Sequence, residues 1–192
     1  MYHRFEENKY PSTNIKIKDF KERNRGYENS PELFMVFSQD QRKEIDPLLN
    51  LSIRVNINGL TINLPEETRN TNVNAYHLCN LAELKQSFDF IFLFVKAYDT
   101  QWITRLIEPY LANDGILVGV QNAMTAERIS KIVGADRTIA CVVECSSELF
   151  IPGIIQRDTP NEKTWFGIGA EKNKENNRLE EVEEILTSVG NV

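Results

Sequence analysis

The sequence predicts an α/β protein with an open, doubly wound parallel sheet. The first observation is three short, continuous apolar runs, which begin at Phe90, Gly115 and Thr138. Runs of this kind are typical of strands that are covered on both faces, as in a parallel sheet. The second observation is the helical spacing of apolar residues between the runs, so that strands and helices alternate along the chain. Parallel strands joined by helices wind right-handedly and build such a sheet.

Local signals set the expected limits of the two intervening helices. The first helix begins behind Asp99 or Thr100 as its N-cap, and Pro109 is expected to bend or end it early. The turn-forming residues 113–115 then break the chain before the second apolar run. The second helix is expected to stop at Gly134. The apolar positions that predict it are Met124, Ile129, Ile132 and Val133.

Shorter elements are predicted on either side of this core. The stretches SIRVNI and LTINL alternate around Asn58-Gly59, which predicts two short strands or a hairpin, and PEETRNTNVN is interpreted as a polar loop. Residues 153–157 and 164–168 are expected to be antiparallel strands around the turn DTPNEK. A final amphipathic helix should end at Gly190. Its apolar positions are Leu179, Val182, Ile185, Leu186 and Val189.

The composition indicates a globular domain and argues against two classes of partner. With 192 residues, 41% hydrophobic and 26% charged, the chain is long enough for one ordinary domain. The net charge of −6 argues against nucleic-acid binding as the main task. The longest apolar run, residues 90–95, is too short to cross a bilayer, and the first ten residues lack a signal-peptide core. We therefore expect a cytosolic protein with neither nucleic acid nor membrane as a partner.

The cysteines and histidines do not predict a metal site. Cys79, Cys141 and Cys145 are odd in number, and their spacing fits neither a zinc ribbon nor a disulfide framework, so we expect buried free thiols. The two histidines, His3 and His77, are far apart in the sequence and have no nearby pair of cysteine ligands. We predict no bound metal.

Two polar side chains follow the first two strands of the predicted sheet. Lys96 comes directly after the first apolar run, and Asn122 follows the second. In an open parallel sheet, ligands bind outside the carboxyl ends of the strands, where an ammonium and a carboxamide could fix the oxygens of a ribose or a carbonyl substrate. The alternative is that Lys96 extends into solvent and Asn122 caps the next helix. The pattern alone favours this alternative.

Longer stretches around these residues resemble the nucleotide-binding domain of the ketopantoate reductase family. The similar stretches are FVKAYDTQW, LIEPYLANDGILVGVQNAMTAERISKIVG and CVVECSSELFIPGIIQRDTPNEKTWFGIG, and the resemblance runs from about residue 45 to the C-terminus. It implies a Rossmann-like domain followed by a helical domain, and NADPH-dependent reduction of the keto group of 2-dehydropantoate to pantoate, on the route to pantothenate and coenzyme A. The family's QNG is here Gln121-Asn122-Ala123, which keeps the asparagine.

The resemblance also assigns roles to single residues. Asn122 would orient the keto acid and contact the cofactor, and Lys96 would hold ribose or carboxylate oxygens of the cofactor and the substrate. Asp46 resembles the acid at the end of the family's second strand, which can accept from ribose hydroxyls and would favour NAD over NADP. An ordinary turn aspartate before Pro47 is an equally good interpretation of Asp46. The expected cofactor is NADP, with NAD as the alternative.

The sequence departs from the family pattern at two points. The turn GxGxxG, which binds pyrophosphate through backbone N–H groups, is absent, since Gly26 is the only glycine among the first 50 residues. Gly167 and Gly169 do not replace it, because no third glycine follows them. The helical domain, which carries the family's catalytic lysine and an acidic substrate-binding residue, has no counterpart here. We therefore expect no catalytic residue in this chain, which looks truncated at both ends.

The expected domain organisation follows from the resemblance. Residues 1–44 are rich in Lys, Glu, Asn and Arg and should form an atypical, partly disordered segment, in which only Leu33–Phe37 has strand character. Residues 45–192 should form an incomplete Rossmann-like sheet with a short antiparallel extension. Without the usual first strand, a central strand would expose its edge, which favours a homo-oligomer or pairing with another chain. Our hypothesis is that Leu33–Phe37 fills this gap.

Three functional interpretations remain open at this point. The chain is a reductase of a small 2-keto acid, or a non-catalytic remnant that binds nucleotide weakly or pairs with another protein, or a fragment of a longer reading frame. A reductase from the wider hydroxyacid dehydrogenase group would share the fold but differ in substrate.

Overall fold

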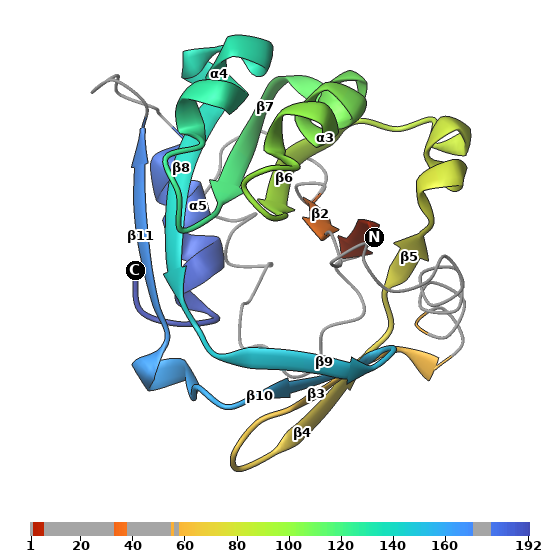
Figure 1. Cartoon of the computed structure of the whole chain (residues 1–192), viewed down its shortest axis with the longest axis vertical. Coiled ribbons are helices and arrows are strands. Elements are labelled where there is room, and N and C mark those ends of the chain that lie inside the picture. The colour runs from red at the N-terminus through yellow and green to blue at the C-terminus, as the bar shows by residue number, and fades with distance from the viewer. Residues whose placement is uncertain (1, 6–32, 38–54, 56–57, 171–177) are drawn as a thin grey trace.

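The computed structural model describes residues 2–5, 33–37, 55, 58–170 and 178–192 (Figure 1). Most strands belong to a seven-stranded sheet in the order β11-β8-β7-β6-β2-β1-β5. The four strands β2, β6, β7 and β8 are parallel, and β11 and β1 run antiparallel to their neighbours. The strands of this sheet are β1 (Tyr2–Phe5), β2 (Leu33–Phe37), β5 (Asn74–Tyr76), β6 (Phe88–Phe94), β7 (Leu111–Val120), β8 (Thr138–Glu144) and β11 (Trp165–Ala170).

Helices cover both faces of the large sheet, as the sequence predicts. The α-helices are α3 (Thr100–Ile107), α4 (Ala126–Val133) and α5 (Leu179–Thr187). Short 3-10 turns lie at Leu78–Glu83, Glu108–Tyr110, Ala135–Arg137 and Asn161–Lys163. Figure 1 shows α3 and α4 together at the top, with α5 on the other side of β8 and β11. No helix among the described residues is long and apolar enough to cross a membrane.

Strand β6 explains why the sheet needs helices on both sides. From Phe90 to Phe94 its side chains alternate between two apolar clusters. Ile91 and Leu93 pack with residues of α3 and α4, whereas Phe90 and Phe92 pack with residues of α5, and all four are fully buried. A strand that buries both faces must be apolar throughout, which is the reason for its continuous apolar sequence.

Strand β2 lies beside β6, where the sequence lacks the family's usual first strand. Leu33–Phe37 pairs in parallel with β6, with Leu33 opposite Phe90 and Phe37 opposite Phe94. The hypothesis that this segment fills the gap is therefore confirmed. The expected exposed edge of the central strand is wrong, because β6 is paired by β2 on one edge and by β7 on the other.

The predicted limits of α3 and α4 agree with the structure, but α5 ends at Thr187, before the predicted end at Gly190. Helix α3 starts at Thr100 behind Asp99 and ends before Pro109, and α4 ends at Gly134, which adopts a φ of 97°. Met124, however, lies outside α4 and is 98% exposed. The predicted break at residues 113–115 lies inside β7, where the pairing with β6 shifts in register. The turn signals there mark an irregularity in the strand.

A second sheet of four strands was predicted only in part. Its order is β4-β3-β10-β9, formed by β3 (Leu60–Asn63), β4 (Thr68–Thr71), β9 (Ser147–Ile151) and β10 (Ile154–Arg157). The polar loop expected over residues 65–74 is wrong, because β4 and the start of β5 lie there. Strand β3 pairs antiparallel with β4, which supplies the hairpin partner. Most of SIRVNI lies outside the described residues.

The expected pairing of residues 153–157 with 164–168 is also wrong. Strand β10 pairs with β3 and β9 in the small sheet, whereas β11 pairs antiparallel with β8 in the large one. Pairing with β8 places Phe166 in the apolar cluster beneath α5. An isolated two-stranded hairpin would not bury Phe166 in this way. The antiparallel extension beside β8 is thus β11, and β1 and β5 extend the other end of the sheet.

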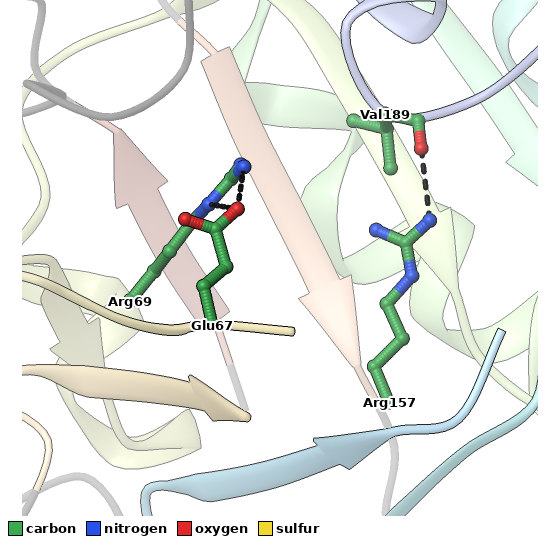
Figure 2. Close-up of polar contacts among 4 residues, drawn as sticks. All are labelled: Glu67, Arg69, Arg157 and Val189. Carbon is green, nitrogen blue, oxygen red and sulfur yellow. Dashed lines mark hydrogen bonds and ion pairs between the residues drawn. The ribbon is translucent and has the colours of Figure 1, made fainter. Parts of the chain in front are cut away.

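Arg157 joins the small sheet to the end of α5. Its Nη2 donates to Thr164 Oγ1 at 2.7 Å and to the carbonyl oxygen of Val189 at 2.9 Å, and its Nε donates to the carbonyl oxygen of Thr159 at 2.9 Å. Figure 2 shows the bond from Arg157 to Val189 beside a second arginine, Arg69, whose guanidinium pairs with Glu67 two residues away. Arg157 connects segments that are distant in sequence, whereas Arg69 makes a local pair at the surface.

Arg157→Met should lower the free energy of unfolding by roughly 2–3 kcal/mol, because it removes three charge-assisted hydrogen bonds from partly buried acceptors. Denaturant titration measures this change. Arg69→Met is the matched control and should cost less than about 1 kcal/mol, as expected for a surface ion pair. Equal losses for the two variants would contradict this role of Arg157.

Candidate functional site

The carboxyl ends of β6 and β7 lie side by side, and the two candidate residues follow them. The strands pair in parallel, with Leu93 opposite Gly119 near their ends. Lys96 lies two residues beyond the end of β6, and Asn122 two residues beyond the end of β7. Both side chains are on the protein surface. The structure therefore brings Lys96 and Asn122 to the same rim of the sheet, and in Figure 1 the arrowheads of β6 and β7 lie next to each other.

Gln121, which lies between the end of β7 and Asn122, makes the main connection within this rim. Gln121 is only 6% exposed. Its Nε2 donates to the carbonyl oxygen of Val95 and to Thr100 Oγ1, both at 2.9 Å, and its Oε1 accepts from Thr125 Oγ1. One carboxamide thus links the end of β6, the start of α3 and the N-cap of α4. Our sequence interpretation missed Gln121, although its place beside Asn122 directly after a buried strand was a usable signal.

The loop that carries Lys96, residues 95–99, has a fixed backbone, and we call it the β6 loop. The amide of Asp99 donates to the carbonyl oxygen of Lys96 at 2.9 Å, and Arg128 Nη1 donates to the carbonyl oxygen of Ala97 at 3.2 Å. The carboxylate of Asp99 accepts from Trp102 Nε1 at 2.8 Å and makes no side-chain cap to α3. These contacts hold the loop against α3 and α4.

The carboxamide of Asn122 bonds to the backbone of β8. Its Nδ2 donates to the carbonyl oxygen of Val143 at 2.7 Å, and its Oδ1 accepts from the amide of Val143 at 2.9 Å. The carboxamide thus pairs with β8 as another strand residue would. The alternative that Asn122 caps α4 is wrong, because Thr125 is the N-cap and α4 has no side-chain cap. Lys96 is exposed.

Other groups near the rim bear on its chemistry. Cys141 on β8 is buried, and desolvation raises the pKa of its thiol to about 12, so it is neutral at physiological pH. Cys145 is free and half-buried, so the expected burial holds for Cys141 more fully than for Cys145. In the part of the chain that the structure describes, no group of three or more His, Cys, Asp or Glu residues could hold a metal ion. Asp46 lies outside the described residues.

Comparison with known proteins identifies the family. The family model described as ketopantoate reductase PanE/ApbA matches residues 40–171, which is more than half of the chain. The chain belongs to the ketopantoate reductase family. The match includes β6, β7 and the residues of the rim. No curated protein sequence matches the chain significantly.

Solved structures share the fold at low sequence identity. The 2-dehydropantoate 2-reductase of Geobacter metallireducens superposes with a TM-score of 0.62 at 16% identity, over 82% of this chain and 49% of that one. The enzyme of the same name from Porphyromonas gingivalis gives 0.63 at 18%, over 82% and 53%. A D-mandelate dehydrogenase bound to NADH and anilino(oxo)acetate gives 0.63 at 14%, over 82% and 48%. The chain spans about half the length of these proteins, and the likeness confirms the predicted Rossmann-like fold class.

Asn122→Ala should lower the free energy of unfolding by about 1–2 kcal/mol, since it removes two hydrogen bonds to the backbone of β8. It should also speed hydrogen exchange of the Val143 amide, which NMR or mass spectrometry can follow. Met124→Ala at an almost fully exposed neighbouring position is the control and should change neither quantity. Slow exchange at Val143 in Asn122→Ala would contradict the pairing.

Proposed function

We propose that this chain forms the cofactor-binding part of an NAD(P)-dependent reductase of a small 2-keto acid, with 2-dehydropantoate as the substrate. One observation carries the proposal: Lys96 and Asn122 share a rim at the carboxyl ends of adjacent parallel strands, in a chain of the ketopantoate reductase family. This is the position at which open α/β sheets bind ligands.

The residues of the rim suit a reaction that reduces a carbonyl. The nicotinamide cofactor supplies a hydride to the keto carbon, and the keto oxygen must receive a proton. Lys96 is an exposed residue whose ammonium would hold ribose hydroxyls or the carboxylate of the substrate. Asn122 would orient the keto acid, which requires its carboxamide to share or exchange its bonds to Val143. The general acid comes, in this proposal, from residues outside 1–192.

The proposed cofactor is NADP, with NAD as the alternative. The resemblance to ketopantoate reductases favours NADP. The similar D-mandelate dehydrogenase binds NADH, and Asp46 would favour NAD if it accepts from the ribose hydroxyls. A nicotinamide cofactor is common to both options.

A non-catalytic role is the second candidate. Residues 1–39, which precede the family match, contain a single glycine, Gly26. They therefore do not supply the glycine-rich turn that usually binds the pyrophosphate. A chain of this kind would bind nucleotide weakly, or would act by pairing with another copy of itself. The edge strand β9 suits such pairing, because all five of its residues are exposed and Phe150 is 82% exposed. We place either form of the protein in the cytosol.

Titration with NADPH and NADH, followed by nucleotide fluorescence, tests the proposal. We expect saturable binding to the wild-type chain, and Lys96→Ala should weaken it by roughly 10- to 100-fold because a charged hydrogen bond is lost. Lys131→Ala is the matched control, since Lys131 is an exposed lysine of α4 paired with Glu127, and it should bind as the wild type does.

Two results would contradict the proposal. Failure to saturate at millimolar nucleotide would favour the non-catalytic role. Equal weakening by Lys96→Ala and Lys131→Ala would mean that binding depends on general charge and not on the rim.

A further inference from the structure

We propose that Gln121 is a positioning residue, which holds the β6 loop so that Lys96 is presented to the ligand. The inference rests on the proposed function, because it concerns how the same rim is prepared for binding. It assigns different roles to the two neighbours in the sequence: Gln121 fixes the loop after β6, whereas Asn122 fixes the end of β8.

The contacts of Gln121 suit this role because each polar atom of its side chain is used. Nε2 has two hydrogens and donates them to Val95 and Thr100, and Oε1 accepts from Thr125. The backbone amide of Gln121 donates to the carbonyl oxygen of Cys141 at 2.9 Å, so β8 fixes its main chain. The residue is buried, and water does not compete for these bonds. A carboxamide alone among the side chains of this size both donates twice and accepts.

The bond to Val95 connects this network to Lys96. The carbonyl group of Val95 lies in the same planar peptide unit as the amide of Lys96, so fixing its oxygen fixes the orientation of that plane. The next carbonyl group, that of Lys96, accepts from the amide of Asp99, and the one after it accepts from Arg128. The backbone on both sides of Lys96 is thus held, while its side chain is exposed.

A fixed backbone favours binding because the conformational entropy of the loop is lost on folding and is not lost again when the ligand binds. Lys96 has a long side chain with many rotamers, and its ammonium can reach a defined place only if the Cα atom is fixed. Without Gln121, the carbonyl oxygen of Val95 and the hydroxyls of Thr100 and Thr125 lose a shared partner, and the β6 loop loses its attachment at Val95.

The test combines a local measurement with a binding measurement on Gln121→Met, which preserves size and removes the polar atoms. We expect hydrogen exchange of the Asp99 amide to accelerate roughly five- to tenfold, and the dissociation constant for NADPH or NADH to rise by a similar factor. Arg157→Met is the control, since it removes hydrogen bonds outside the β6 loop, and it should leave both quantities unchanged under conditions in which both variants are folded.

The outcomes separate the role of Gln121 from the proposed nucleotide binding. Unchanged exchange at Asp99 in Gln121→Met would overturn the inference, and so would a released loop with unchanged nucleotide affinity, since Gln121 would then be merely structural. Absence of nucleotide binding by the wild-type chain would contradict the proposed function, while the exchange of the Asp99 amide still decides whether Gln121 holds the loop. If Gln121→Met does not fold, Thr100→Val removes one of its acceptors and should shift both measurements in the same direction.

Discussion

Strand β6 is buried on both faces and paired on both edges, and the rest of the structure depends on this burial. Phe90 and Phe92 face α5, Ile91 and Leu93 face α3 and α4, and β2 and β7 pair with its backbone. A buried backbone group without a partner would cost as much as a lost hydrogen bond, so the strand requires a neighbouring strand on each side. Leu33–Phe37 supplies the neighbour that the sequence after residue 45 lacks.

The position of the candidate site follows from this arrangement. Parallel pairing aligns the carboxyl ends of β6 and β7, which brings Lys96 and Asn122 to one rim although 26 positions separate them. The rim is then stiffened by Gln121 and Arg128, which donate to the backbone carbonyl oxygens of Val95 and Ala97, and by Asp99, whose carboxylate accepts from Trp102 Nε1. The same residues that satisfy the backbone also fix the geometry of the rim. The hydrogen bonds that stabilise the strand ends therefore also hold the rim in place for ligand binding.

The sequence predicted those parts whose signals are local. The apolar runs of β6, β7 and β8 and the periodicity of α3, α4 and α5 depend on burial by nearby elements, so the fold class and the placement of Lys96 and Asn122 could be derived. Strands β4 and β9 could not, because they are polar or exposed and owe their form to pairing with β3 and β10. The role of Gln121 was missed because its partners come from three elements, and one lies 26 residues away. Asn122 was placed correctly, but its bonds to Val143 depend on where β8 passes.

The account can be tested most directly at β2, because the continuous sheet requires this strand beside β6. Hydrogen exchange of the Leu33–Phe37 amides, measured on the folded chain by mass spectrometry with the β6 amides as the internal reference, is the decisive measurement. The account predicts slow exchange for these amides, in the range of those of β6. Exchange as fast as that of an unstructured peptide would contradict the pairing, and would leave β6 with an open edge.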